Sequence, residues 1–189
     1  MTFEQMQEQL KQDLKPDRYI HTMGVVDTAV QLALHYHADA GQARIAALLH
    51  DCAKYIPMEE RIDYCRSHQV EVTEAEEENL TLLHAKCGSI RAQEEYGISD
   101  PDILHAITVH TTGCPDMNLL DKIIFVADYI EPNRDTAPNL EKWRKMAYED
   151  LDGTVAGISS DTLAYLKDAG RPIDPVTYDT WVYYSQERK

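Results

Sequence analysis

The sequence predicts an all-α protein of one domain, and three observations support this prediction. Apolar residues recur at three- and four-residue intervals along most of the 189-residue chain, which is the spacing of one face of a helix. The alternation of apolar and polar residues that marks a strand is nearly absent. The eight glycines and eight prolines stand mostly at the expected ends of helices. The length suits one domain with a sizeable core, so we expect residues 1–189 to fold as a single unit.

Residues 1–50 contain three expected amphipathic helices. The first spans 3–14 and ends before Pro16, because proline cannot continue a helix. The second runs from Asp17 to about His35, with five apolar side chains directed into the core: Ile20, Met23, Val26, Val30 and Leu34. Asp39 can cap the third helix, which carries small residues up to His50. These small residues would let neighbouring helices approach closely.

Proline and capping residues delimit the middle of the chain. Pro57 precedes a short expected helix over 58–68. Thr73 and Glu76 have the spacing of a capping box, in which each residue bonds the backbone of the other. A longer helix is expected over 82–96.

Two strong boundary signals follow that helix. Gly97 fits a C-terminal cap, and Asp100 followed by Pro101 is a typical helix start, because proline at the first helical position loses no hydrogen bond. The helix that begins there leads to His110. Residues 119–130 form the most apolar stretch of the chain, and we expect them to be a buried helix.

The C-terminal part has the pattern of two further helices and an aromatic tail. Residues 140–151 and 155–168 are the expected helices, and Gly170 stops the second. We expect residues 175–189 to pack back on the body of the protein. This stretch is also a candidate homodimer interface, because three large aromatic side chains lie in it: Trp181, Tyr183 and Tyr184.

Composition excludes several classes of protein. The net charge of −15 argues against a nucleic-acid polymer as the ligand, because such binders need a basic surface. The N-terminus lacks the basic and apolar blocks of a secretory signal, and no stretch reaches the roughly 20 apolar residues that span a bilayer. We therefore expect a cytoplasmic protein without a membrane partner. The four cysteines form no C-x-x-C pair, so a zinc ribbon is not indicated.

The adjacent pair His50-Asp51, which follows an apolar run, is the strongest chemical signal. Other histidines and a carboxylate, each next to its own apolar stretch, are spread through the chain: His21, His84, His110 and Asp128. Burying two carboxylates beside several imidazoles is unfavourable unless a cation lies among them. Nitrogen and oxygen ligands without thiolates suit a catalytic divalent metal such as zinc, iron or manganese.

The chain resembles the HD-domain superfamily of metal-dependent phosphohydrolases. His21, His50-Asp51 and Asp128 match the family's pattern of a first histidine, a His-Asp doublet and a distant aspartate. The surrounding stretches resemble the YqeK-type branch of symmetrical bis(5'-nucleosyl)-tetraphosphatases: Arg18 to Thr22, Leu49 to Lys54, Leu83 to Ala85, Ile107 to Gly113 and Ala127 to Arg134.

This resemblance implies a fold, a cofactor and a reaction. The fold would be an HD-domain helical bundle with a metal-ligand core over about 17–131 and additional C-terminal helices over about 132–189. The metal ligands would be His21, His50, Asp51 and Asp128, with iron favoured and manganese, cobalt or zinc as alternatives. The enzyme would hydrolyse diadenosine tetraphosphate to two molecules of ADP. The alternatives are an HD-type phosphatase or phosphodiesterase for other nucleotides, and a non-catalytic nucleotide sensor.

Several basic residues are candidates for contacting the substrate phosphates: Arg18, Lys54, Arg134 and Arg171. Arg18 lies three residues before His21 and Lys54 three after Asp51, so spacing alone places both near the expected metal. Tyr129 either stacks on a base or fills the core.

His84 and His110 have two alternative roles. They either bind a second metal ion bridged by Asp51, or face the substrate phosphates as hydrogen-bond donors and as the general acid for the departing nucleotide. The second role is preferred at this point, and Asp51, Lys54, His84 and His110 are the expected catalytic residues.

Overall fold

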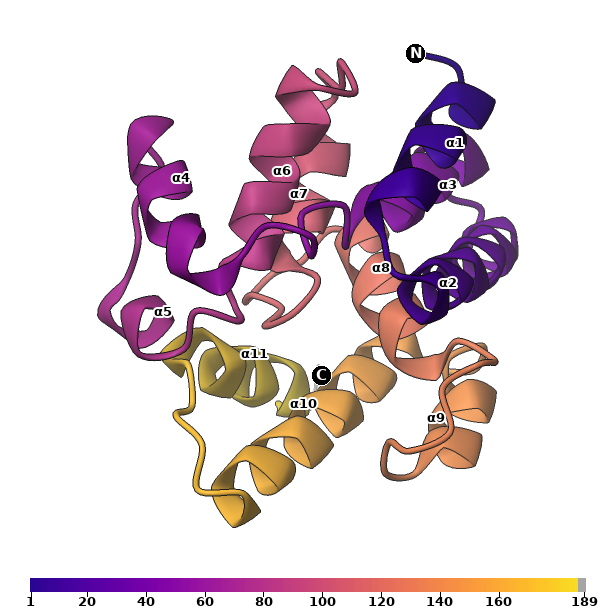
Figure 1. Ribbon diagram of the computed structural model, residues 1–189. Helices are drawn as coiled ribbons and strands as arrows, with labels where there is room; N and C mark the ends of the chain where they lie inside the picture. Colours follow the sequence, from indigo (N-terminus) through magenta and orange to yellow (C-terminus); the bar gives the residue numbers. More distant parts are fainter. Residues whose placement is uncertain (187–189) are drawn as a thin grey trace.

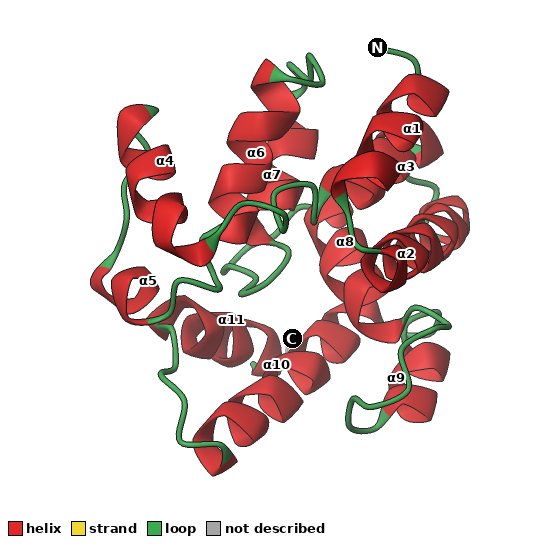
Figure 2. Ribbon diagram, viewed as in Figure 1, coloured by secondary structure: helices red, strands yellow, loops and turns green. Residues whose placement is uncertain are grey.

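The structure is a computed structural model that describes residues 1–186, and it confirms the all-helical prediction. Eleven α-helices and one 3-10 helix make up the described part of the chain, which contains no strand (Figures 1 and 2). In chain order they are α1 (Phe3–Asp13), α2 (Pro16–His35), α3 (Ala40–Leu49), η1 (Met58–Glu60), α4 (Arg61–Ser67), α5 (Glu74–Glu78), α6 (His84–Glu94), α7 (Pro101–Val109), α8 (Leu119–Ile130), α9 (Leu140–Met146), α10 (Leu151–Asp168) and α11 (Pro175–Ser185).

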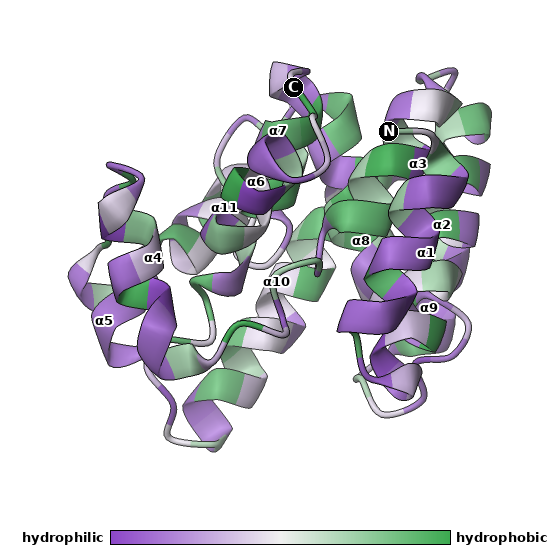
Figure 3. Cartoon of the chain, turned by 45° about the horizontal axis from the view of Figure 1, so that its top comes forward, coloured by the Kyte–Doolittle hydropathy of each residue, from purple (hydrophilic) through white to green (hydrophobic). Residues whose placement is uncertain are grey.

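The helix α8 is the centre of the bundle. It packs against α2, α3, α7 and α10, and these neighbours surround it in Figure 1. Its sequence is the predicted apolar stretch, and eight of its side chains are buried. Figure 3 shows α8 as mainly hydrophobic, whereas the outer α1, α4 and α5 carry hydrophilic surfaces. Packing against four neighbouring helices fixes the positions of the polar side chains near the C-terminal end of α8.

Local capping chemistry confirms several predicted helix ends. The Asp39 carboxylate accepts hydrogen bonds from two backbone amides at the start of α3, and Asp100 accepts one at the start of α7. Thr73 and Glu76 form the predicted capping box. Gly97 has a φ of 72°, the left-handed conformation that terminates a helix at little cost for glycine.

Two side chains of α2 were wrongly predicted to face the core. Ile20 is 53% exposed and Leu34 is 64% exposed. The buried strip of α2 consists mainly of small and β-branched residues, which let α3 and α8 approach closely: Thr22, Gly24, Val25, Val26, Thr28, Ala29, Leu32 and Ala33. The prediction was based on the larger apolar residues, which lie partly on a different face of α2. Close packing against α3 and α8 instead buries the face that carries the small residues.

The C-terminal boundaries also differ from the prediction. The helix predicted over 140–151 ends at Met146, and the next begins at Leu151, four residues earlier than predicted. Asp150 explains the earlier start, because its carboxylate accepts a hydrogen bond from the amide of Gly153 and so caps α10. Similarly, the helix predicted over 82–96 begins at His84.

The aromatic C-terminal segment packs back on the protein, as predicted, through contacts between α11 and α10. Tyr184 is buried, and the Tyr183 hydroxyl donates a hydrogen bond to Asp116. The end of the predicted segment, residues 187–189, lies outside the described residues. None of the helices described is both long and apolar enough to cross a membrane.

Candidate metal centre

Six residues predicted to form the site converge in the interior of the bundle. They come from five helices that are far apart in the sequence: His21 from α2, His50 and Asp51 from the end of α3, His84 from the start of α6, His110 from the end of α7 and Asp128 from α8. His50, Asp51, His84 and His110 are almost completely buried. Four of them are the predicted metal ligands, and the other two, His84 and His110, are predicted catalytic residues.

The first half of the cluster contains His21, His50, Asp51 and Asp128. The His21 Nε2 atom lies 3.0 Å from Asp128 Oδ1. The His50 Nε2 atom lies 3.6 Å from Asp51 Oδ2 and 3.8 Å from Asp128 Oδ1. His21, His50 and Asp51 each direct one potential ligand atom to a common point, so they could hold a metal ion.

The second half contains His84 and His110 and shares Asp51 with the first. Asp51 Oδ1 lies 3.2 Å from His84 Nε2 and 3.6 Å from His110 Nε2. The two Nε2 atoms are 3.1 Å apart, and the Thr111 hydroxyl lies beside both. Asp51, His84 and His110 form a second group that could hold a metal ion. One carboxylate therefore belongs to two potential ion sites.

All four histidines use their Nδ1 atoms in the same way. In His50, His84 and His110, Nδ1 faces the backbone carbonyl oxygen of the residue three positions earlier. In His21, Nδ1 lies 3.1 Å from the Glu131 carboxylate. An oxygen acceptor holds the proton on Nδ1, which leaves the lone pair on Nε2 directed into the cluster. This arrangement is the one that metal-binding histidines adopt.

Two of the four Nε2 atoms lack a hydrogen-bond partner, and the other two have each other and the Thr111 hydroxyl as partners. Those of His21 and His50 are buried and make no hydrogen bond. The Nε2 atoms of His84 and His110 face each other. With the proton of each ring on Nδ1, the two Nε2 lone pairs would point at each other, which is unfavourable. A cation among these nitrogen and oxygen atoms resolves both conflicts, and the donor set therefore fits a divalent metal.

Burial sets the protonation states of the cluster. It lowers the pKa of His50 and of His84 to about 4, so both imidazoles are neutral at neutral pH. Burial alone would raise the pKa of Asp51, but the neighbouring His50 and Lys54 outweigh it and hold that pKa well below its usual value. Burial would lower the pKa of His21, yet the carboxylates of Asp128 and Glu131 raise it. Neutral His50 and His84 beside the ionised Asp51 are the forms that bind metal.

Glu131 was not predicted from the sequence to belong to the site. Its side chain is 1% exposed, and its second carboxylate oxygen accepts a hydrogen bond from the amide of Asn133. Gly24 provides the space, because a Cβ atom there would lie 2.2 Å from that oxygen. The available signal was an acidic residue directly after the apolar stretch 119–130 and three residues beyond Asp128.

Three of the predicted basic residues lie against the cluster carboxylates. Arg18 Nη1 is 2.9 Å from Asp51 Oδ2, and Lys54 Nζ is 3.7 Å from Asp51 Oδ1. Arg134 Nη2 is 3.0 Å from Asp128 Oδ1 and also donates to the Asp128 backbone carbonyl. The positions of Arg18 and Lys54 agree with the prediction from sequence spacing that both lie near the metal site.

Tyr129 and Arg134 line a separate cavity of about 450 Å³ together with Tyr165. The Tyr129 hydroxyl donates a hydrogen bond to the Pro138 carbonyl. Arg171 is exposed, and its guanidinium lies 5.7 Å from the centre of the Tyr165 ring, with no described contact to the cluster. A phosphate-binding role for Arg171 stays a prediction.

Comparison with known proteins identifies the family. The HD domain model matches residues 18–133, a range that contains the whole cluster. The chain belongs to the HD-domain family. This result confirms the resemblance seen in the sequence.

Related HD-domain proteins match along almost the entire chain. A Bacillus subtilis protein is 41% identical over 172 residues, which is 91% of each chain, and one from Halalkalibacterium halodurans is 43% identical over 182 residues, which is 95% of each. Both carry the name symmetrical bis(5'-nucleosyl)-tetraphosphatase. The crystal structure of an HD superfamily hydrolase from Clostridium acetobutylicum is 40% identical and superposes with a TM-score of 0.94 over 97% of each chain.

Proposed function

We propose that this protein is a metal-dependent hydrolase that cleaves diadenosine tetraphosphate symmetrically into two molecules of ADP. The names of the relatives that are 41% and 43% identical over more than nine tenths of the chain support this substrate. The observation that carries the chemistry is the set of four imidazoles whose Nε2 atoms face two carboxylates, while each Nδ1 faces an oxygen acceptor.

His21, His50, Asp51 and Asp128 would hold the catalytic divalent metal. When bound there, such an ion lowers the pKa of a coordinated water and polarises a phosphoryl oxygen. The nitrogen and oxygen donor set suits iron, manganese, cobalt and zinc, and the resemblance to the tetraphosphatase branch favours iron. Glu131 would act on His21 by fixing the orientation of its ring and raising the basicity of its Nε2.

His84 and His110 fit the role of ligands to a second ion better than the role of general acid. A general acid must hold a proton at the atom that faces the substrate. The Nδ1 of His84 faces a backbone carbonyl, and the low pKa of this buried imidazole leaves its Nε2 unprotonated at neutral pH. Together with the shared Asp51, this supports two ion sites, which reverses the preference drawn from the sequence.

The basic residues supply positive charge to the phosphates. Phosphoanhydride cleavage develops negative charge on the attacked and departing phosphates, and preorganised cations stabilise that charge. Arg18 and Lys54 touch Asp51 while remaining partly open to solvent, so their head groups border both the cluster and the route by which a nucleotide enters. Arg134 has the corresponding position beside Asp128.

Replacing Asp51 tests the proposed function. Asp51→Asn removes a charged ligand shared by both potential ion sites, so we expect a loss of diadenosine tetraphosphate turnover of at least about 1000-fold with an unchanged helical circular dichroism spectrum. The matched control is Asp27→Asn on the exposed surface of α2, which should retain activity. Near-normal turnover of Asp51→Asn with iron, manganese or cobalt would contradict the proposal.

A substrate panel separates the alternatives. Symmetrical dinucleoside polyphosphates should be hydrolysed faster than mononucleotides, and ADP should be the sole nucleotide product from diadenosine tetraphosphate. Faster release of phosphate from mononucleotides would instead indicate an HD-type phosphatase. Nucleotide binding without any product would indicate a sensor.

A further inference from the structure

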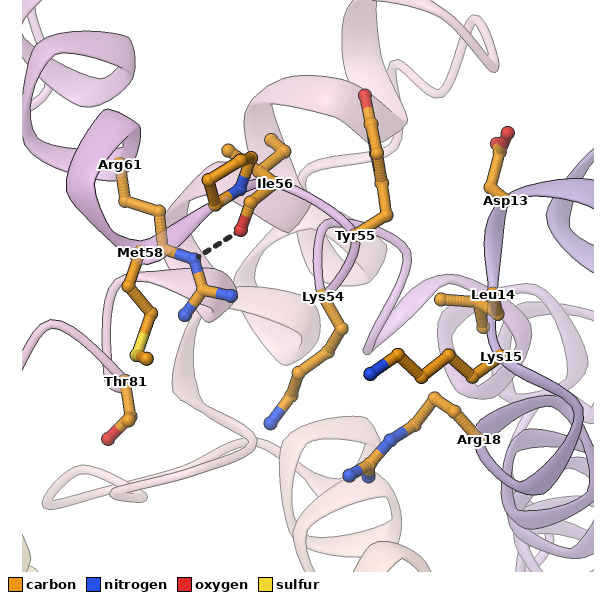
Figure 4. A pocket seen from close by; sticks show the side chains of 11 residues that line it. Asp13, Leu14, Lys15, Arg18, Lys54, Tyr55, Ile56, Met58, Arg61 and Thr81 are labelled. Atoms are coloured by element: carbon orange, nitrogen blue, oxygen red, sulfur yellow. Dashed lines mark hydrogen bonds between the residues drawn. The ribbon is translucent and has the colours of Figure 1, made fainter.

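A basic cavity of about 590 Å³ opens beside the metal centre. Four positively charged side chains line it, and Figure 4 shows their nitrogen-bearing ends directed towards the space between them: Lys15, Arg18, Lys54 and Arg61. They come from the start of α2, from the segment after Asp51 and from the start of α4. The volume lies within the range of roughly 300–1,000 Å³ that is typical of small-molecule sites.

The local charge of this cavity is opposite to that of the whole chain. The protein has a net charge of −15, yet Asp13 is the single acidic residue among those lining the cavity. The Asp13 carboxylate is already paired with Arg91 of α6. Within the described residues, neither Lys15 nor Arg61 has a carboxylate partner. The cavity therefore presents unneutralised positive charge.

Arg61 is the most informative of these cations, because it is only 5% exposed. Its Nε atom donates to the Ile56 carbonyl and its Nη1 atom to the Leu80 carbonyl, which leaves further N–H groups of the guanidinium free. Burial lowers the pKa of Arg61 from its ordinary value. A buried cation without a counter-ion is unfavourable, and an anion in the cavity would remove that penalty.

Other lining residues connect the cavity to the cluster and provide an apolar surface. Arg18 and Lys54 each contact Asp51, so an anion held by them lies next to the metal centre. Tyr55 and Met58 also line the cavity and are exposed, although they are large apolar side chains. Figure 4 shows the Met58 side chain beside Arg61, whereas the Tyr55 ring is directed away from the charged ends and has the Arg91 guanidinium 4.3 Å from its centre. Phosphate-binding charge beside an exposed, flexible thioether suits a nucleotide, because the sulfur packs favourably against an aromatic base.

We propose that this cavity binds one nucleoside diphosphate half of the dinucleotide substrate, with its phosphates against Lys15 and Arg61 and its base against Met58. The assignment rests on the proposed function for the identity of the substrate. Arg18 and Lys54 then lie between the bound phosphates and Asp51, where the bond to be hydrolysed is presented to the metal centre. Lys15 and Arg61 were not singled out by the sequence, because neither lies within a motif.

Direct binding of ADP to the metal-loaded protein, measured by isothermal titration calorimetry, tests this site without relying on turnover. The side chain of Lys15 makes no capping hydrogen bond, so Lys15→Gln removes charge without removing a structural contact. We expect this variant to bind ADP about fivefold more weakly. The matched control Lys11→Gln, which removes the same charge from the exposed end of α1, should bind ADP like the unmodified protein.

Three further variants separate the contributions to binding. Arg61→Gln should weaken ADP binding by about tenfold or more, and Arg61→Lys should restore part of it. Met58→Ala should weaken the binding of ADP but leave that of inorganic pyrophosphate unchanged, because pyrophosphate has no base.

Equal ADP affinity in Lys15→Gln, Lys11→Gln and the unmodified protein would overturn the assignment, as would a Met58→Ala variant that binds ADP normally. Lys15→Gln could lose ADP affinity while the unmodified protein does not hydrolyse diadenosine tetraphosphate. That result would support the cavity as an ADP site and contradict the proposed function. If the substrate is hydrolysed and the ADP affinities are equal, the cavity assignment alone fails.

Discussion

The four cluster histidines share one arrangement of their ring nitrogens in the interior of the bundle. Each presents Nε2 to the interior and keeps Nδ1 against an oxygen acceptor. His105 shows the contrast, because it is half exposed and its Nδ1 pairs with Asp121 away from the cluster. For His21 the acceptor is the carboxylate of Glu131. We therefore expect the metal affinity of the His21 imidazole to depend on Glu131.

Glu131→Gln should weaken metal binding while leaving the fold intact. Glutamine can still accept a hydrogen bond from His21 Nδ1, but it lacks the charge that raises the basicity of the imidazole. Loss of such an outer partner typically lowers metal affinity 10- to 100-fold, and we expect about tenfold here. Competition titration of manganese against a chelating dye measures the affinity. Glu141→Gln on the exposed surface of α9 is the matched control, and equal affinities of the two variants would show that Glu131 has no positioning role.

At the scale of elements, α2 organises one side of the site. Lys15, Arg18, His21 and Gly24 follow one another at three-residue intervals, which form an oblique row across the surface of a helix. The row begins at the basic cavity, passes the Asp51 carboxylate and the cluster, and ends where Glu131 approaches the backbone. A single helix therefore sets the distance between the basic cavity and the candidate metal centre.

Gly24→Ala should lower metal affinity even though alanine is the better helix former by about 1 kcal/mol. The added Cβ would lie 2.2 Å from Glu131 Oε2, so the carboxylate must move away from its position beside His21. We expect a loss of affinity similar to that of Glu131→Gln, measured by the same titration. The control is a double-mutant cycle with Glu131→Ala, in which Gly24→Ala should have little further effect. An equal loss in both backgrounds would mean that Gly24 acts through another contact.

The helix ends show which elements were predictable from local chemistry. Asp39, Thr73 and Asp100 satisfy backbone amides within three residues, so their caps follow from sequence spacing. The exposure of Ile20 and Leu34 was not predictable in this way. Which face of α2 is buried depends on how closely α3 and α8 can pack against its small residues.

At the scale of the whole molecule, the cluster joins helices from α2 to α8 at one point. Its ligand candidates span residues 21 to 128 of the chain, so they are adjacent only in the folded state. A ligand that binds the native state and not the unfolded chain stabilises the native state. The metal centre should therefore contribute to the stability of the entire bundle.

Removing the metal should lower the melting temperature. At a free metal concentration about 1000 times the Kd, binding contributes about 4 kcal/mol, which corresponds to roughly 10 °C for a domain of this size. Differential scanning calorimetry before and after chelation, with metal content determined in both samples, measures the shift. Asp51→Asn should show a much smaller shift. An unchanged melting temperature after confirmed loss of metal would contradict an interhelical site.

The sequence by itself determined the helical class, most helix starts and the identity of the six cluster residues. Helical periodicity and caps depend on neighbours within one or two turns, and the histidines and aspartates stand within recognisable motifs. Only the tertiary structure placed Glu131 beside His21 and brought Lys15 and Arg61 to one cavity, because these contacts join residues that are far apart in the chain. It also aligned the imidazole nitrogens of His84 and His110, which favours a second ion site. Side-chain orientation follows from packing between helices, and no local pattern encodes it.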